Sequence, residues 1–517
     1  MVIRCLRICI LLLLFCNVHS SVKGSDSCVH KDYGNGGTVC VCNSQFCDEV
    51  GPIPPLESAK YILYSSSKIG DRLTRTGGEF NRNNYSRNRI RIAVDRKCAY
   101  QTILGFGGAF TDSAGINIMS LSDSVQNLLI RSYFSQDGIE YGMGRVPIGG
   151  SDFSTHTYTY DDVAGDVMLS HFNLSEEDFN YKIPLIKMAM RMSQKEIKLI
   201  GTAWTAPPWM KTNNDFSGFG FLKYEFFQVW ADYMIRFLNE YKENGLKFWG
   251  ITTGNEPING IIPINRFNSM GWTPRDQREW ISKNLGPSMA ASQHNNTKLI
   301  LLDDQRFMLP WWVNIVMSDA NAERYIDGIG VHWYWDNLVP ASALDATHYA
   351  HPKKFILATE ASIGDKPWDF QKVLLGSWSR GEQYMKDIVE DLQHWVVGWI
   401  DWNLALNPRG GPNWAKNYVD SPIIVNATGD EFYKQPMFYA IGHFSKFIPE
   451  GSVRIGLNIT EGEHYLNGVA FQRPDGGITV VIYNPKDSSA AVSITDDRYG
   501  DVNLEFQPRS FHTLVYM

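Results

Sequence analysis

Between residues 103 and 403 the chain alternates short apolar runs with longer amphipathic stretches. The apolar runs end in glycine or polar residues, and stretches such as 179–193, 226–244 and 275–292 repeat apolar residues at the 3.6-residue spacing of an α-helix. This alternation favours a parallel α/β fold, and eight strands are the number that closes a (β/α)8 TIM barrel. The predicted strands are 103–106, 141–146, 198–203, 248–253, 299–302, 326–331, 355–358 and 396–400.

The C-terminal part of the chain has a different pattern. Short apolar runs are separated there by turn residues, which is typical of antiparallel strands in a β-sandwich. Two apolar segments near the N-terminus can supply further strands, so we expect the sandwich to be built from both ends of the chain. The predicted sandwich strands are 468–473, 478–484, 490–495 and 511–517, with 61–64 and 90–94 from the N-terminal side.

Two glutamates follow predicted barrel strands. Glu256 lies in Gly-Asn-Glu-Pro after the fourth strand, and Glu360 lies in Thr-Glu-Ala-Ser after the seventh. Because working groups of such barrels gather at the carboxyl ends of the strands, we expect the two side chains to face each other across the mouth. Two carboxyl groups about 5 Å apart are what a retaining glycosidase needs, one as nucleophile and one as acid/base.

Two other interpretations of these glutamates are possible from the sequence. One glutamate after a strand is usually a surface or helix-capping residue, and the chain could be a non-catalytic protein that binds a glycolipid. The pair within one barrel pattern favours catalysis, since a binding protein has no need for both carboxylates. The sequence lacks a Gly-x-Ser-x-Gly elbow and a phosphate loop with its lysine, and no glutamate motif accompanies His348 and His351. We therefore expect no metal and no organic cofactor.

Further strand ends carry the residue types of a sugar site. Carboxylates and amides pair with sugar hydroxyls, and indole faces stack on the apolar faces of a pyranose. These candidates are Arg145 and Asp152 after the second strand, Trp204 after the third, His332 and Tyr334 after the sixth, and Trp402 after the eighth.

The net charge and the N-terminal residues indicate which partners and which cellular location the protein can have. The 517 residues have a formal net charge of -7, which argues against a nucleic-acid partner and against a generally basic membrane-binding surface. Arg4 and Arg7 flank a short apolar run at 8–15, which is the layout of a secretory signal over residues 1–24, with an uncleaved anchor as the alternative. No later segment is apolar for long enough to span a bilayer, so we expect only peripheral contact with membranes.

The cysteines and glycosylation sequons fit an exported protein. Cys28, Cys40, Cys42 and Cys47 predict two disulfides in one of three pairings, with a zinc site as the competing interpretation. We expect Cys98 to be a buried free thiol. The sequons are at Asn84, Asn173, Asn295, Asn426 and Asn458.

The chain resembles the glucosylceramidase family, the lysosomal acid β-glucosidases, over nearly its whole mature length. The stretches that carry the resemblance are 40–47, 105–112, 145–153, 203–213, 253–257, 332–334, 358–362 and 398–422. The resemblance implies hydrolysis of glucosylceramide to glucose and ceramide through a glucosyl-enzyme intermediate, as part of sphingolipid catabolism. It also implies delivery to the lysosome through the secretory pathway, with secretion from the cell as the alternative.

The resemblance assigns roles to individual residues. It implies Glu256 as acid/base and Glu360 as nucleophile, and it implies disulfides that pair Cys28 with Cys40 and Cys42 with Cys47. The implied substrate-binding residues are Asp152, Phe153, Trp204, Asn255 and Trp402, with Tyr334, Phe267 and Asn417 around the entrance; His332 and Arg145 complete the set of candidates.

The resemblance also divides the chain. It implies a small disulfide-bearing β domain from 25–52 and 403–435, and an immunoglobulin-like β-sandwich from 53–100 and 452–517. The catalytic barrel takes 101–402 and 436–451.

The sequence leaves more alternatives open for the binding partners than for the reaction. The family implies glucosylceramide in membranes, but whether this chain needs a saposin-type activator and anionic phospholipid is open. The apolar loop at 368–378 could meet a membrane, or it could be the buried start of a helix. The same mechanism on a steryl or soluble β-glucoside is the alternative, since entrance loops select the aglycone.

Overall fold

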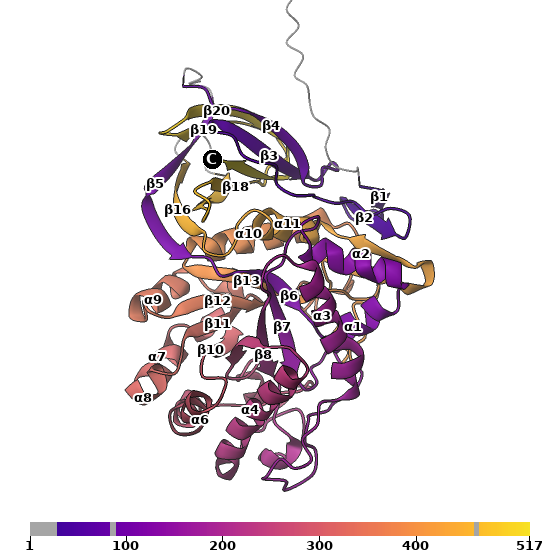
Figure 1. Cartoon of the computed structure of the whole chain (residues 1–517), viewed down its shortest axis with the longest axis vertical. Coiled ribbons are helices and arrows are strands. Elements are labelled where there is room, and N and C mark those ends of the chain that lie inside the picture. The colour runs from indigo at the N-terminus through magenta and orange to yellow at the C-terminus, as the bar shows by residue number, and fades with distance from the viewer. Residues whose placement is uncertain (1–27, 83–88, 460–464) are drawn as a thin grey trace, which may run out of the picture.

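The protein consists of a closed barrel with surrounding helices, a β-sandwich packed on two of these helices, and a small sheet beside both (Figure 1). The structure is a computed structural model that describes residues 28–82, 89–459 and 465–517. The predicted signal at 1–24 and the sequon at Asn84 lie outside these residues.

The barrel has eight parallel strands, as the apolar runs predict. Its closed order is β10-β11-β12-β13-β6-β7-β8-β9. Strands such as β7 and β8 are buried along their whole length, because helices cover the outer face and side chains fill the interior. The strands are β6 (Gly105–Ala109), β7 (Met143–Ile148), β8 (Lys198–Ala203), β9 (Phe248–Thr252), β10 (Lys298–Gln305), β11 (Gly328–His332), β12 (Phe355–Glu360) and β13 (Val396–Asn403).

The predicted strand at 198–203 matches β8, and each of the other seven predicted barrel strands begins or ends one to three residues away from the observed strand. The run at 103–106 predicts a strand that stops at Phe106, whereas β6 continues through two glycines to Ala109. The glycines are needed for close packing, since a Cβ on Gly107 would lie 2.1 Å from the carbonyl oxygen of Met143. Strand β10 continues past Leu302 through a bulge into polar residues, which the apolar pattern does not reach.

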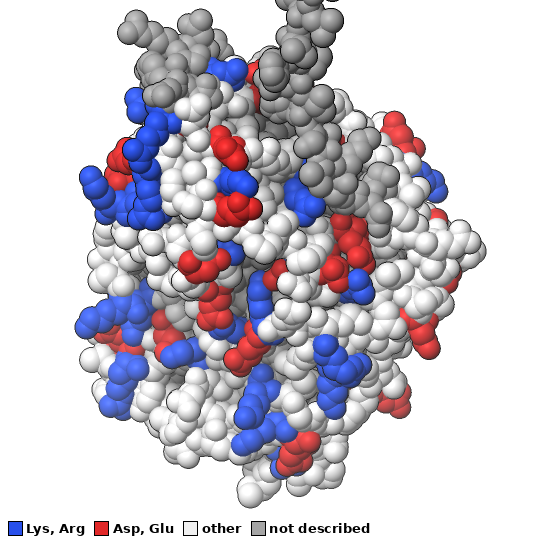
Figure 2. Space-filling model, turned by 45° about the horizontal axis from the view of Figure 1, so that its top comes forward, with Lys and Arg blue, Asp and Glu red and all other residues white. Residues whose placement is uncertain are grey.

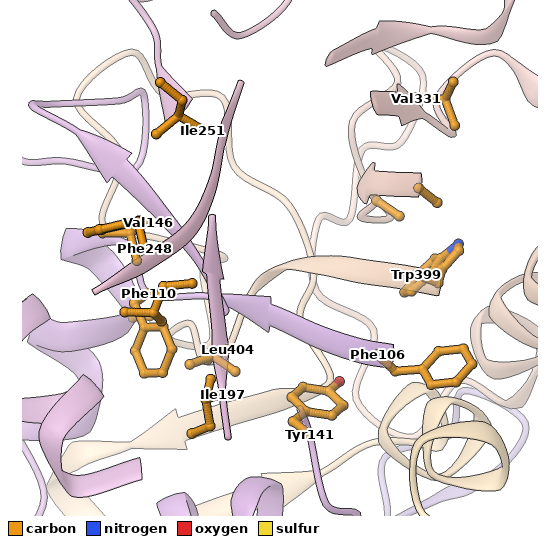
Figure 3. Close-up of a cluster of buried hydrophobic side chains, with 14 of the residues drawn as sticks. Phe106, Phe110, Tyr141, Val146, Ile197, Phe248, Ile251, Val331, Trp399 and Leu404 are labelled. Carbon is orange, nitrogen blue, oxygen red and sulfur yellow. The ribbon is translucent and has the colours of Figure 1, made fainter. Parts of the chain in front are cut away.

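Helices surround the barrel, and the core lies mainly between them and the strands. Trp399 of β13 packs against Tyr384 of α10, and Phe248 of β9 packs against Phe237 of α4. Figure 3 shows Trp399, Phe248 and their neighbours projecting from the strands into this layer. The helices are α1 (Asp112–Met119), α2 (Asp123–Phe134), α3 (Ile183–Met192), α4 (Phe227–Glu243), α5 (Pro274–Trp280), α6 (Gly286–Ala291), α7 (Trp311–Met317), α8 (Ala320–Glu323), α9 (Ser342–Ala350), α10 (Trp378–Gln393) and α11 (Pro436–Ser445).

The sandwich combines strands from both ends of the chain, as the sequence predicts. Its order is β20-β19-β5-β16-β17-β18-β21-β3-β4, and a bridge between Asn81 and Asp501 brings the two edges together. The strands are β3 (Lys60–Ser67), β4 (Thr74–Glu79), β5 (Ile90–Thr102), β16 (Val453–Ile459), β17 (Asn467–Gln472), β18 (Ile478–Asn484), β19 (Ala490–Asp496), β20 (Gly500–Phe506) and β21 (Ser510–Tyr516).

Helix α11 joins the sandwich to the barrel. All of its residues are buried, as expected for a helix that is apolar on every side. Phe444 of this helix packs against Phe106 of β6, while His443 faces Phe511 of β21. The shared apolar contact fixes the sandwich on the barrel, and β5 runs from one into the other (Figure 1).

The small sheet carries the disulfides that the family resemblance implies. Cys28 is bonded to Cys40, and Cys42 to Cys47. The sheet has the order β1 (His30–Asp32), β2 (Thr38–Asn43), β15 (Glu431–Lys434) and β14 (Ile423–Asn426).

The prediction for Cys98 was wrong, because this thiol is exposed. It lies on an outward-facing part of β5 and donates to Asp95 Oδ2 at 3.2 Å, so no apolar layer covers it.

The surface charges and the exposure of the sequons are relevant to the predicted export and membrane contact. Figure 2 shows basic and acidic side chains interspersed over the face that it draws. In the described part of the chain, no helix is both long and apolar enough to cross a membrane. Among the described sequons, Asn173, Asn295 and Asn458 are exposed, whereas Asn426 is half-buried and donates to Glu431 and the hydroxyl of Tyr433. Glycosylation of these four asparagines stays a prediction.

Replacing Gly107 with alanine should destabilise the protein by about 3 kcal/mol, because the new methyl group would collide with the backbone of β7. Gly142→Ala is the matched control, since a Cβ there meets no atom within 4 Å. Urea-induced unfolding followed by tryptophan fluorescence measures both variants. Equal stability of the two would contradict the packing argument.

Candidate active site

The two predicted glutamates meet at the carboxyl ends of the barrel strands. Glu360 is the last residue of β12, and Glu256 lies four residues beyond the end of β9. Both are buried, and one carboxylate oxygen of each lies within 4.8 Å of the other and of a nitrogen of His332. This proximity matches the separation expected of two carboxyl groups that act on the same bond.

The backbone at Glu256 is strained. Its φ is 43°, in the left-handed region that side chains other than glycine rarely adopt. The conformation is held by a hydrogen bond from Glu256 N to Asp303 O at 2.9 Å and by one from Asn255 N to Ala203 O at 2.8 Å. Strain that neighbouring strands maintain is common where a side chain must be aimed at a reacting group.

Glu360 is held by a cation and a hydroxyl. Arg145, fully buried on β7, donates to Glu360 Oε2, and Tyr334 Oη donates to Glu360 Oε1 at 2.6 Å. Burial raises the pKa of Glu360, while the positive charges of Arg145 and His332 act against this.

Glu256 has a different set of partners. Its Oε1 accepts from Gln305 Nε2 at 2.7 Å and from His332 Nδ1 at 2.8 Å, and its Oε2 accepts from Asn259 Nδ2. Burial alone would lower the pKa of His332, but the charge of Glu360 and hydrogen bonds to Asp303 and Glu256 raise it to about 10. His332 is therefore a cation at acidic and neutral pH, and both of its ring nitrogens donate.

A second layer of carboxylates lies under the glutamates. Asp303 accepts from Arg145 at 2.8 Å, from His332 at 3.1 Å and from the hydroxyl of Thr359 at 2.6 Å. Although burial acts in the opposite direction, Arg145 and His332 hold the pKa of Asp303 below its ordinary range. Burial and the charge of Glu256 raise the pKa of the neighbouring Asp304 to about 8.

The glutamates open into a cavity of about 280 Å³. Trp204 and Trp402 stack on each other in its wall, with ring centroids 4.9 Å apart. Asp152 accepts from Asn413 at 3.3 Å and from Asn417 at 3.2 Å. Burial, together with the charge of Glu360, raises the pKa of Asp152 to about 7.

The structure brings most of the predicted site residues to this cavity. The lining contains Asp152, Phe153, Trp204, Asn255, Glu256, Phe267, Tyr334, Glu360, Trp402 and Asn417. Arg145 and His332 lie behind the glutamates instead. They contact the carboxylates and are not part of the cavity wall.

Sequence reasoning missed Asn259, Asp303, Asp304 and Gln305. The last three follow the apolar part of the fifth strand, so the strand-end rule that selected the other residues would also have selected them. Asn259 carries no comparable signal, because it lies in a turn three residues after Glu256.

The arrangement suits acid/base and nucleophilic chemistry. One carboxylate contacts a guanidinium and a phenol, while the other contacts two amides and an imidazolium, so the two groups have unequal surroundings. Glu256, His332 and Glu360 are close enough to share a cation, yet both ring nitrogens of His332 are engaged by carboxylates. A metal-binding role does not fit a histidine whose nitrogens both carry protons.

Comparisons with known proteins agree with this geometry. Residues 103–448 match the Glycosyl hydrolase family 30 TIM-barrel domain, and residues 451–514 match the Glycosyl hydrolase family 30 beta sandwich domain. The lysosomal acid glucosylceramidase of Mus musculus is 45% identical over 498 residues, which cover 95% of this chain and 96% of the relative.

Solved structures show the same architecture. SrfJ from Salmonella typhimurium is 27% identical with a TM-score of 0.81, and the match covers 88% of this chain and 99% of SrfJ. The endo-beta1,6-glucanase BT3312 is 25% identical with a TM-score of 0.78, over 88% of this chain and 99% of the glucanase. With its barrel, sandwich and facing carboxylates, the chain belongs to glycosyl hydrolase family 30 and is a glycoside hydrolase.

Proposed function

We propose that this glycoside hydrolase is a retaining β-glucosidase that releases glucose from glucosylceramide. The observation that carries the proposal is the close approach of Glu256 and Glu360 at the floor of one cavity. Carboxyl groups that are close together favour the retaining mechanism, because an inverting enzyme must leave room for a water molecule between them.

The proposed reaction has two displacements. Glu360 attacks the anomeric carbon and forms a bond to it, while the bond to the leaving oxygen breaks and Glu256 gives that oxygen a proton. Glu256 then takes a proton from water, whose oxygen attacks the same carbon and releases Glu360. Glucose leaves with its original anomeric configuration.

The charges around the site support this division of roles. A nucleophile must be ionised, and Arg145 together with the hydroxyl of Tyr334 stabilises the negative charge of Glu360. Glu256 instead accepts hydrogen bonds from the amides of Asn259 and Gln305 and from the ring of His332, so its surroundings differ from those of Glu360. The stacked indoles of Trp204 and Trp402 and the carboxyl group of Asp152 provide the contacts that a glucose ring needs.

The lipid part of the substrate is supported by the entrance and by the mouse relative. Trp368 is 62% exposed and Phe370 is 94% exposed, on the apolar loop that precedes α10. Leu374 and Leu375 of the same loop are half-buried, and Trp378 is buried at the start of the helix, so the loop has an exposed part and a buried part. Trp368 lines a hollow that shares Tyr334 and Asp365 with the cavity of the glutamates. Exposed aromatic side chains at such a place suit peripheral contact with a membrane.

We propose the lysosome as the site of action, with secretion as the alternative. This location rests on the similarity to a lysosomal enzyme and on the predicted signal. A saposin-type activator and anionic phospholipid are the proposed partners, and sphingolipid catabolism is the proposed pathway.

Two alternatives differ in substrate or in activity. The likeness to an endo-beta1,6-glucanase favours a second candidate, the same chemistry on a soluble β-linked glucoside. A protein that binds glycolipid without hydrolysing it is the other.

Glu360→Gln should abolish turnover, because an amide cannot act as the nucleophile. Glucose release from glucosylceramide in vesicles with anionic lipid, at mildly acidic pH, compares the variant with the parent. Unchanged tryptophan fluorescence should show that the variant is folded. Ordinary activity of the variant would contradict the assignment of the nucleophile.

The same assay separates the alternatives when a soluble β-1,6-linked glucan is run beside the vesicles. Release by the parent from the glucan alone would favour the second candidate. If the parent bound glucosylceramide and released glucose from neither substrate, the binding protein would be the better account.

His332→Gln should lower stability most at acidic pH. The pKa of His332 is raised from 6.5 to about 10 in the folded protein, so its charge stabilises the fold fully below about pH 6.5 and progressively less toward pH 10. Losing one partner of a buried charge network costs about 3 kcal/mol.

Urea unfolding at a series of pH values measures this difference between the variant and the parent. His351→Gln is the control, since this half-buried histidine hydrogen-bonds Asn314 at the surface and should matter little between pH 5 and 9. A stability loss for His332→Gln that did not change with pH would show that folding does not raise the pKa of His332.

A further inference from the structure

Only one oxygen of Glu256 is free to exchange a proton with a substrate. Oε1 already accepts two hydrogen bonds, from Gln305 and from the protonated His332, and these use both of its lone pairs. Oε2 must therefore carry the proton that reaches the leaving oxygen. Asn259 contacts this oxygen, and it does so through an N–H donor.

Asn259 is fixed in place by its surroundings. Its backbone N–H donates to Glu256 O at 2.9 Å, and it begins a short turn, Asn259–Ile261. The next residue, Gly260, packs so closely that a Cβ on it would lie 1.9 Å from the backbone nitrogen of Gly271. Ile258 N donates to Asp304 Oδ2 at 3.1 Å on the other side. The amide is thus preorganised at the cavity wall.

We propose that Asn259 is a positioning residue that makes Glu256 a stronger acid. The inference rests on the proposed function, in which Glu256 is the acid/base. As the proton moves from Oε2 to the leaving oxygen, that oxygen takes the electron pair of the breaking bond to the anomeric carbon. Oε2 gains negative charge in this step, so the N–H bond from Asn259 is stronger in the transition state than in the ground state.

The two steps of the reaction are affected in opposite directions. Stabilising the ionised carboxylate favours proton donation to a poor leaving group, such as the alcohol of a lipid. It also means that Glu256 loses its proton, and with it the ability to act as an acid, at a lower pH. In the second step it makes Glu256 a weaker base toward water. Gln305 also stabilises the ionised carboxylate, but it binds Oε1, whereas Asn259 binds the oxygen that transfers the proton.

The test compares the parent with Asn259→Ala and Asn259→Asp on two soluble glucosides. Octyl β-glucoside needs protonation of its leaving alcohol, whereas 2,4-dinitrophenyl β-glucoside does not. For Asn259→Ala, kcat/KM should fall about tenfold on the octyl substrate and by less than about threefold on the aryl substrate, as expected for the loss of one hydrogen bond to a charged group.

The pH profile gives the second readout. The alkaline limb of kcat/KM on the octyl substrate should move up by about one pH unit in Asn259→Ala. It should move further in Asn259→Asp, where a second carboxylate opposes ionisation of Glu256. Ile262→Ala, which changes the same cavity wall but removes no hydrogen-bond donor, should leave the limb where the parent has it.

Each outcome has a distinct meaning. Equal losses on both substrates with an unmoved alkaline limb would overturn the inference and leave Asn259 a structural role. If the parent hydrolysed neither glucoside nor glucosylceramide, the proposed function itself would fail. Should Asn259→Ala unfold on heating well below the parent, Asn259→Asp keeps the shape of the side chain in the turn, and its effect on the alkaline limb provides the test.

Discussion

A network of buried charges at the mouth of the barrel is the constraint on which the site depends. Arg145 from β7 and His332 from β11 are both shielded from water, and Asp303 on β10 contacts both. Buried charges are costly unless every member has a partner, so removing one leaves the others uncompensated. The network therefore ties three strands to the glutamates, and the geometry of the site and the stability of the barrel mouth are linked.

The same network affects which nearby carboxyl groups ionise. The two cations are balanced by Asp303 and Glu360, so further negative charge in this region has no partner. The pKa of Asp152 is raised to about 7 and that of Asp304 to about 8, by burial first and by a neighbouring glutamate second. Both groups hold a proton at mildly acidic pH. Asp152 adds a negative charge beside Glu360 above about pH 7, and Asp304 adds one beside Glu256 above about pH 8.

The apolar pattern was sufficient for the barrel, because strands buried on both faces read as continuous apolar runs ending at the site. It identified Glu256 and Glu360 for the same reason. It did not predict that β10 continues past Leu302, since the chain bulges there and takes a positive φ at Leu302 and Asp303. Tertiary contact decides such features: Gly107 reads as a turn residue in sequence, yet it lies in β6 because the neighbouring strand approaches it too closely for any side chain.

The two glutamates have different surroundings because they occupy different positions relative to their strands. Glu360 is still part of β12, where strand geometry aims it at Arg145, a group that favours its charged form. Glu256 lies beyond β9 in a left-handed backbone conformation, which turns it toward amide donors and His332. Glu256 therefore differs from Glu360 both in backbone conformation and in the groups that donate to its carboxylate. Backbone geometry at the strand ends thus supports nucleophile and acid/base as separate roles for two residues of the same type.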